Sequence, residues 1–329
     1  MKQLPPTAPG APRGGRHELI LLALVLLEWG YFCAVGRNFA TRDSTFDILR
    51  HSAEIGLLAL AMTPVILTGG IDLSVGSLLG LCAIVFGKLW RDAGLSPAVA
   101  AAITLAVGAL AGGVNAGLIA WLRLPPLIVT LGTYSLFRGL AEAVTHGVDT
   151  FTNFPPGFLF LGQERVLGIP AQAPLFALVA AGVWVLVHRT TYGRAWRAIG
   201  FAPEGARYAG LPVGRRVAQV YLFAGLVSAL AAILYTARLG QAKADAGTGY
   251  ELFAITAVVL GGTSIFGGSG SVHGTLLGVI AIAVLNSGLV HAMQPREVAG
   301  MLTGLLLLAA LAGSLLPAKL RAWGRRPGN

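Results

Sequence analysis

Five long runs of this 329-residue chain contain no Asp, Glu, Lys or Arg. The runs are residues 96–122, 166–187, 217–237, 252–272 and 298–318. Each can hold a helix of about 20 residues, the length that crosses a hydrocarbon core of about 30 Å. Because backbone groups in lipid must be hydrogen-bonded within the protein, only helices or a closed barrel can span a membrane. Barrel strands alternate apolar and polar residues, and these runs do not, so we expect an all-α membrane protein.

The composition agrees with a polytopic membrane helical bundle. Hydrophobic residues make up 55% of the chain and charged residues 12%, whereas soluble proteins carry about 25% charged residues. The pattern predicts about ten transmembrane helices, near residues 19–36, 53–70, 73–90, 97–121, 126–145, 171–188, 215–236, 252–266, 272–291 and 297–316. The net charge of +10 is typical of basic cytoplasmic loops on such a protein, and we expect no nucleic acid partner.

The basic residues also predict the orientation. Residues 188–216 contain six arginines and one acid, and residues 318–329 contain four basic residues and no acid. Basic loops face the cytoplasm, so we place both termini there. We divide the chain into a disordered basic tail (1–16), a transmembrane domain (17–317) with a cytoplasmic loop at 189–214, and a basic tail (318–329). Glu28 interrupts the first apolar stretch, which favours an uncleaved span over a secretory signal.

A glycine break with a lone acid stands inside one apolar stretch. Residues 60–81 are interrupted at Gly69-Gly70, and Asp72 follows the break. Ionisable groups inside a bilayer are costly and tend to be functional. Asp72 is therefore either a cap on the next helix or a pathway residue at a discontinuous helix. A similar glycine break over residues 260–278 is compatible with an internal repeat, as many transporters have.

Motifs for catalysis, nucleotide binding and metal binding are absent from the sequence. The glycine-rich segment 261–271 lacks the lysine of a P-loop and the spacing of G-x-G-x-x-G. The six histidines form no H-x-x-x-H pair, and no G-x-S-x-G motif occurs. We therefore predict no catalytic residue, no metal and no cofactor in this chain, which is not expected to be an enzyme.

The basic loop at 190–212 has the pattern of a short helix. Pro203 suits the first helical turn and Glu204 suits the positive end of a helix. Gly210, followed by Pro212, marks the helix end. Such a helix could dock on a soluble partner, and an ordinary basic loop is the alternative.

Isolated polar residues inside the expected spans have two interpretations. Asn115 and Asn286 either hold helices together or offer hydrogen bonds to a passing solute. Arg138 and Glu142 lie four residues apart, so they share a helix face and can form an ion pair.

Several segments together resemble the ribose/xylose-type permease family of bacterial ABC importers. The resemblance covers about residues 45–316. It rests on residues 68–77, 125–133, 138–141, 193–200, 204–211, 246–252 and 257–264. Residues 115–118 and 267–271 lean toward the rhamnose and autoinducer-2 branches. Departures at Ala116, Phe253 and 209–211 leave the substrate open.

The resemblance implies the permease subunit of an ATP-driven importer for a monosaccharide or sugar-like solute in the bacterial inner membrane. Its implied partners are an ABC ATPase subunit, which carries ATP and Mg, a second permease subunit, identical or not, a periplasmic sugar-binding protein and membrane lipid. Because a sugar presents hydroxyls and no net charge, we expect hydrogen-bonding groups along the pathway. The candidates are Asn115, Thr133, Tyr134 and Asn286, together with Asp72 and Ser74 at the glycine break. The implied ATPase-coupling residues are Gly193, Arg194, Arg197, Gly200, Glu204, Arg207 and Gly210.

Three alternative functions remain open at the level of sequence. The first is a branched-chain amino-acid permease of a related ABC importer. The second is a secondary transporter driven by an ion gradient, which would bury coupling carboxylates near mid-membrane. The third is a membrane enzyme, for which the sequence supplies no nucleophile or metal site.

Overall fold

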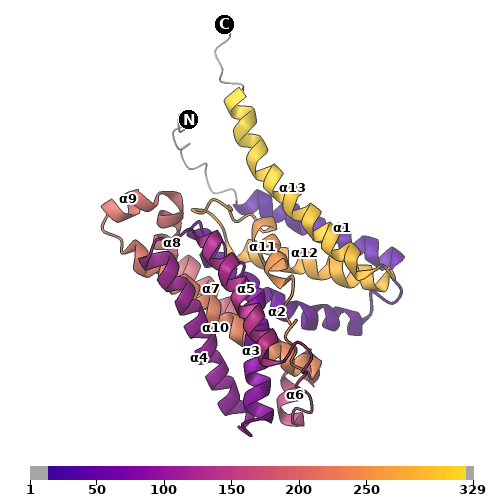
Figure 1. Ribbon diagram of the computed structural model, residues 1–329. Coiled ribbons are helices and arrows are strands. Elements are labelled where there is room, and N and C mark those ends of the chain that lie inside the picture. The colour runs from indigo at the N-terminus through magenta and orange to yellow at the C-terminus, as the bar shows by residue number, and fades with distance from the viewer. Residues whose placement is uncertain (1–13, 324–329) are drawn as a thin grey trace.

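The computed structural model describes residues 14–323, which form a bundle of helices with one small two-stranded ribbon (Figure 1). The expected all-α class is thus correct apart from this ribbon. Residues 1–13 and 324–329, which belong to the two expected tails, lie outside the described residues. Residues 14–16 of the expected disordered tail are helical and begin the first helix.

The elements follow one another along the chain in this order. They are α1 (Gly14–Val35), α2 (Arg42–Leu67), α3 (Val75–Arg91), α4 (Pro97–Ala116), the π-helix η1 (Gly117–Trp121), α5 (Pro126–Val144), α6 (Pro156–Gln163), β1 (Arg165–Val166), β2 (Ile169–Pro170), α7 (Ala173–Arg189), α8 (Thr191–Phe201), α9 (Pro203–Tyr208), α10 (Val213–Leu239), α11 (Tyr250–Leu260), α12 (Val272–His291) and α13 (Arg296–Trp323).

The start of several helices follows from local chemistry. The hydroxyl of Ser96 accepts a hydrogen bond from the amide of Val99, and Pro97 occupies the first turn of α4. Ser271 caps α12 in the same way through the amide of Gly274, at 3.0 Å. These side chains satisfy amide groups that the first turn of a helix leaves unpaired.

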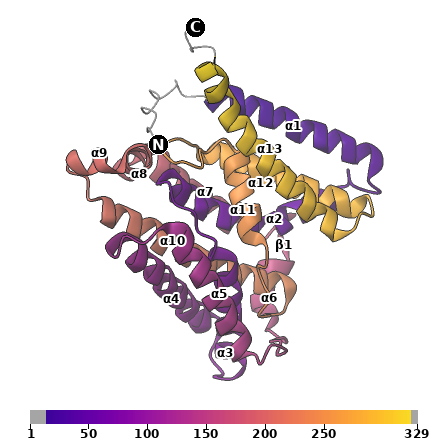
Figure 2. The same cartoon turned by 45° about the horizontal axis from the view of Figure 1, so that its top comes forward.

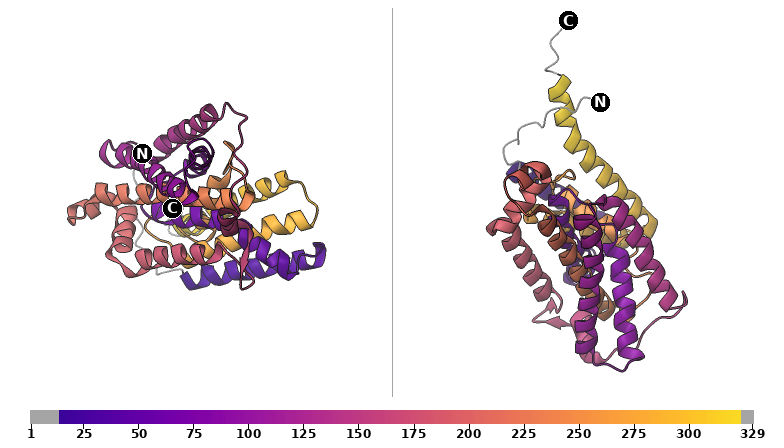
Figure 3. Two further views of the ribbon diagram at one scale, coloured as in Figure 1. Left: turned by 90° about the horizontal axis from the view of Figure 1, so that it is seen from below. Right: turned by 60° about the vertical axis from the view of Figure 1, so that its left-hand side comes forward.

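The centre of the bundle is built from α2, α3 and α10. Residues 56–67 of α2 are all buried, and most of α3 is buried as well. A helix segment that is apolar on all sides is suited to such a position. α10 packs against α2, α3 and α4. On the other side of the bundle, α1 and α11 pack against α12, and α13 packs against α11 and α12 (Figure 3).

The number of membrane spans is only partly supported by the structure. Among the described residues, the helices long and apolar enough to cross a membrane are His17–Val35, Pro97–Trp121, Pro126–Val144, Val213–Leu239 and Val272–His291. The bent pair of α7 and α8, with 67° between them, would add a sixth. The count of ten and the internal repeat therefore stay predictions.

Two expected spans have wrong boundaries. The span at 53–70 begins too late, because α2 already starts at Arg42, where Thr41 caps it by accepting from the amide of Ser44. The span at 252–266 ends too late, because α11 stops at Leu260. Gly262 follows with a φ of +86°, a left-handed conformation that ends a helix.

A non-helical segment, residues 240–249, precedes the short helix α11. Ala242 and Ala246 within it are buried, and Ala242 pairs with Phe151 in an isolated β-bridge. α11 has 11 residues, so it is about 16 Å long and too short to cross a bilayer alone. The segment is buried at Ala242, Ala244, Ala246 and Gly247, whereas Asp245 and Thr248 within it are exposed.

The two ends of the bundle are distinct. At the end that carries α8 and α9, the loop 261–271 meets the start of α1 and the end of α2. His17 Nε2 lies 2.9 Å from the Leu260 carbonyl, and the Gly268 amide donates to the Leu67 carbonyl at 3.0 Å. The β-ribbon lies at the opposite end, where Arg165 pairs with Asp43 at 2.7 Å (Figure 2). We call these the α8–α9 end and the ribbon end.

Candidate functional site: a buried polar chain and the α8–α9 surface

Four of the expected pathway residues are joined in one chain of hydrogen bonds. Thr133 of α5 donates to Asn115 Oδ1 at 2.8 Å, and Asn115 Nδ2 donates to Ser74 Oγ at 2.9 Å. Ser74 Oγ in turn donates to Asp72 Oδ1 at 2.6 Å. The chain of hydrogen bonds therefore ties the break between α2 and α3 to α4 and α5.

The same four side chains are enclosed by protein. Asp72 is 2% exposed and Asn115 is 1% exposed. The amide of Ser74 also donates to Asp72 Oδ1, at 2.9 Å, so the carboxylate caps the turn that leads into α3. The expected cap on the first turn of the next helix is not formed, because α3 has no side-chain cap hydrogen bond and Asp72 accepts only from Ser74, the residue before the helix. The Asp72 carboxylate belongs instead to this turn and to the inter-helix network. A path for solute through this point would have to open the network.

Tyr221 of α10 extends this polar region and was not foreseen from the sequence. It is fully buried, and its hydroxyl has no hydrogen-bond partner among the described residues. A Cβ atom at Gly70 would overlap this hydroxyl, so the glycine break makes room for the tyrosine. Tyr221 is one of two tyrosines in the uncharged run 217–237, and a phenol hydroxyl within such a run was the available signal.

The remaining two expected pathway residues lie elsewhere. Tyr134 is half-buried on α5, next in sequence to Thr133. Asn286 lies on α12, where its amide group donates to the Ile282 carbonyl of the same helix at 2.8 Å. Among the described residues, no hydrogen bond connects Asn286 to the polar chain.

The expected ion pair between Arg138 and Glu142 is wrong. Arg138 Nη1 instead donates to the carbonyl oxygens of Ala244 and Ala246, the latter at 3.0 Å. Glu142 is exposed. The guanidinium therefore satisfies carbonyls of the irregular segment 240–249, which helical hydrogen bonds do not reach.

The basic loop is more helical than expected. α8 covers residues that we expected to be loop, and α9 is the short helix expected at 203–210, with Gly210 at a φ of +80° after its end. Arg194, Glu204 and Arg207 are exposed, and Glu204 pairs with Arg207 at 3.0 Å. Tyr208 is 90% exposed. An aromatic ring surrounded by charges on α9 is available to a partner.

Three other members of the expected coupling set contact the rest of the protein: Arg197 and Gly193, described here, and Gly200, described next. Arg197 donates to the carbonyls of Val187 and Gly270, at 2.8 and 3.3 Å. Gly193 is buried, and a Cβ atom there would overlap the Val187 carbonyl. These contacts fix the orientation of α8 relative to α7 and to the loop 261–271.

Gly200 connects α8 to the glycine break. A Cβ atom at Gly200 would overlap the Leu67 carbonyl and approach the Gly268 amide. Leu67 is the last residue of α2, and Asp72 follows it by five positions. Gly200 of α8 therefore packs directly against the backbone that leads into the polar chain.

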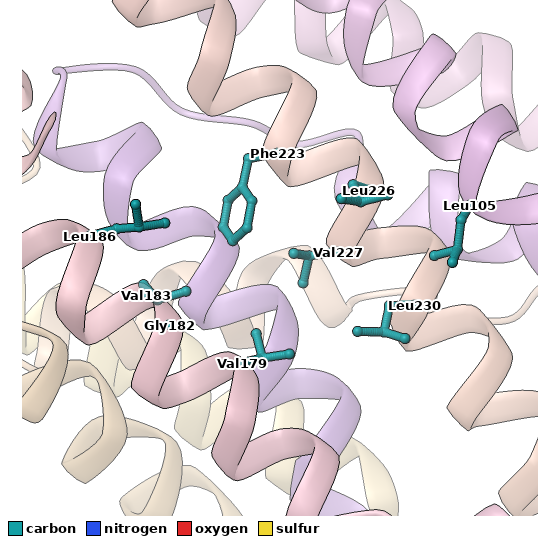
Figure 4. A pocket seen from close by; sticks show the side chains of 9 residues that line it. All are labelled: Leu105, Val179, Gly182, Val183, Leu186, Phe223, Leu226, Val227 and Leu230. Carbon is teal, nitrogen blue, oxygen red and sulfur yellow. The ribbon is translucent and has the colours of Figure 1, made fainter. Parts of the chain in front are cut away.

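A surface pocket between α4, α7 and α10 has a different character (Figure 4). Its lining is entirely apolar, formed by Leu105, Val179, Gly182, Val183, Leu186, Phe223, Leu226, Val227 and Leu230. Such a surface offers no hydrogen bonds to a polar solute. In the described part of the chain, no three His, Cys, Asp or Glu side chains come together to hold a metal ion.

Comparisons with known proteins agree on a family. The model of the family described as branched-chain amino acid transport system / permease component matches residues 44–311. The autoinducer 2 import system permease protein LsrD of Escherichia coli K12 is 38% identical over 320 residues, 95% of this chain and 97% of that protein. Its counterpart in Yersinia enterocolitica is 39% identical over 305 residues, 90% of this chain and 91% of that protein.

No solved structure matches the chain. The family match covers most of the chain, and the two relatives align over nearly their whole length. The resemblance drawn from the sequence motifs is thereby confirmed, and the chain belongs to the permease family of ABC importers.

Proposed function

We propose that this chain is the inner-membrane permease subunit of an importer for a sugar-like solute, and that the solute is autoinducer 2. The observation that carries the proposal is the end-to-end similarity to permeases named for autoinducer 2 import. The buried polar chain supports it, because hydroxyl and amide groups are the natural partners of a polyhydroxylated solute.

The α8–α9 end faces the cytoplasm in this proposal, and so do both termini. Six arginines at 188–216 favour that orientation under the positive-inside rule. About ten segments then cross the membrane, with α2, α3 and α11 largely shielded from lipid by the surrounding helices. A second permease subunit, the same chain or a sibling, completes the pathway.

Energy enters through a separate ATPase that docks on the exposed face of α8 and α9. Tyr208, Glu204 and Arg207 form the contact, and Gly200 transmits its movement to the end of α2. A periplasmic binding protein delivers the solute at the ribbon end. ATP binding and hydrolysis by the partner shift the pair of permeases between outward-open and inward-open states, because the partners bind these states with different affinity.

Uptake in cells tests this proposal. In a strain that lacks the chain, we expect uptake of labelled autoinducer 2 to be lost and to return when the gene is restored. Unlabelled leucine in excess is expected to leave this uptake unchanged. Branched-chain amino acids are the second candidate substrate, because the family takes its description from them, and loss of leucine uptake with intact autoinducer 2 uptake would favour them.

A further inference from the structure

Two glycines on one face of α3 seat the irregular segment and the start of α11. A Cβ atom at Gly76 would overlap the Glu251 carboxylate and the Gly247 carbonyl. A Cβ atom at Gly80 would overlap the Arg138 guanidinium and the carbonyl oxygens of Ala244 and Ala246. Positions 76 and 80 are one helical turn apart, so they lie about 5–6 Å from one another on the same face. Arg138 and Glu251 are therefore neighbours across this face.

Each of the two side chains keeps one polar atom without a partner. Glu251 is 7% exposed, and its Oε2 atom is buried without a hydrogen bond among the described residues. Arg138 is held through Nη1 by the carbonyls of Ala244 and Ala246, while its buried Nη2 atom has no partner within the described chain. A buried donor and a buried acceptor thus belong to side chains that pack on adjacent turns of α3, both atoms unsatisfied.

The two charges do not satisfy one another. No ion pair within 4.0 Å joins Arg138 and Glu251 in the part of the chain that the structure describes. Leaving a buried charged group without hydrogen bonds costs several kcal/mol. Each such group in a native structure calls for an explanation, such as a bound water, an ion or a functional role. Structural needs explain the Nη1 contacts of Arg138, and they leave its Nη2 atom unexplained.

We propose that Arg138 and Glu251 form a solute-binding site in the half of the bundle nearer the ribbon end, completed by two hydroxyl groups of a neutral polyhydroxylated solute. One solute hydroxyl donates to Glu251 Oε2, and a second solute oxygen accepts from Arg138 Nη2. Charged groups form stronger hydrogen bonds to hydroxyls than neutral groups do. The site rests on the proposed function, since it takes the solute class from there.

The position of the pair fits a site along the path of the solute. Tyr134 lies one turn before Arg138 on α5, and Thr133 of the buried polar chain precedes Tyr134. Glu251 also lies near the polar chain along α3, because Gly76, against which its carboxylate packs, follows Ser74 by two residues. A solute released from the Arg138–Glu251 pair then meets the buried polar chain further along the bundle.

An amino acid is the competing ligand for such a pair. Its ammonium group would face Glu251 and its carboxylate would face Arg138, and the two charges would be neutralised. The similarity to autoinducer 2 permeases favours a hydroxyl-bearing solute instead. Leucine is therefore the second probe in the test.

The test uses the purified complex of this chain with its ATPase, in detergent and in proteoliposomes. In detergent, autoinducer 2 is expected to raise the melting temperature of the native complex, since a ligand that binds only the folded state stabilises it. Glu251→Gln and Arg138→Lys are expected to abolish that increase and to lower uptake into proteoliposomes at least about tenfold, at equal amounts of assembled complex. The control is Glu142→Gln, the same Glu-to-Gln change at an exposed position one turn beyond Arg138. We expect it to leave unchanged both the increase in melting temperature caused by autoinducer 2 and the uptake into proteoliposomes.

Each outcome decides a distinct question. A role in structure alone would lower the melting temperature of the variants and leave the increase caused by autoinducer 2 in place. Uptake by Glu251→Gln at the native rate would overturn the site. If leucine raised the melting temperature of the native complex and Glu251→Gln removed that increase, the pair would be assigned to an amino acid instead. If the native complex transports no autoinducer 2 at all, the proposed function fails, and this is seen without any variant.

Discussion

Glu54 of α2 and Arg238 of α10 form an ion pair inside the bundle, with 2.7 Å between Arg238 Nε and Glu54 Oε1. Their side chains are 0% and 7% exposed, and Arg238 Nη1 lies 2.9 Å from His51 Nδ1. The pair fastens the last turns of α10 to α2 near the ribbon end. It therefore holds the two central helices together at the end opposite α8 and α9.

Removal of the arginine alone should be costly. Arg238→Met leaves the Glu54 carboxylate buried without its counter-charge, and we expect the free energy of unfolding to fall by roughly 3–5 kcal/mol. Thermal or denaturant unfolding of the purified protein in detergent measures this. The double variant Glu54→Leu with Arg238→Met should recover most of the loss, because no unpaired charge remains. Equal stability of Arg238→Met and the native protein would show that the pair is not formed.

The polar chain predicts a transport defect from the loss of one hydroxyl. Thr133→Val keeps the volume of the side chain and removes the donor to Asn115, so we expect stability to fall by about 1–3 kcal/mol and uptake to fall several-fold. Thr104→Val is the matched control, because the buried Thr104 hydroxyl donates only to the Ala100 carbonyl of its own helix, α4. Equal uptake by the two variants would remove Thr133 from the pathway.

Orientation is tested by two exposed positions at opposite ends. Tyr208 on α9 is 90% exposed and Leu167 in the ribbon turn is 97% exposed. With Cys33 and Cys82 replaced, Leu167→Cys should react with an impermeant thiol reagent in intact cells, and Tyr208→Cys should react only after the membrane is opened. The reverse result would invert the topology.

The α8–α9 surface predicts a defect in coupling without a defect in folding. Glu204→Lys breaks the exposed pair with Arg207 and puts a positive charge at the positive end of α9. We expect normal insertion, weaker retention of the ATPase in a pull-down and loss of uptake. The control for the pull-down is Glu164→Lys, the same change on an exposed position at the opposite end, which is expected to leave retention of the ATPase unchanged. Normal uptake by Glu204→Lys would mean that α9 is not the contact with the ATPase.

The helices were the most predictable part of the fold. The observed bounds of α4 with η1, of α5 and of α12 agree closely with the expected 97–121, 126–145 and 272–291. Absence of charge marks α4 and α12 over their whole length, whereas α5 contains Arg138 and Glu142. Prediction failed where apolar residues leave the helical conformation. Residues 261–266 are as free of charge as a helix, and only the left-handed Gly262 reveals the loop.

The polar site was predicted in part for a related reason. Asp72, Ser74 and Asn115 stand out because they are polar in apolar stretches, and the structure joins them. Their direct hydrogen bonds could not be predicted, since positions 74 and 115 are brought together only by packing of α3 against α4. Arg138 shows the same limit: its spacing to Glu142 suggested a local pair, whereas its partners are carbonyls more than a hundred residues away.

The central claim is that this chain moves a sugar-like solute with energy supplied by a separate ATPase. Purified chain, ATPase and binding protein, reconstituted together in liposomes, test it directly by the accumulation of labelled autoinducer 2. The account predicts accumulation that requires all three proteins and ATP, and no accumulation by the chain alone under an imposed proton or sodium gradient. Gradient-driven accumulation by the chain alone would contradict it.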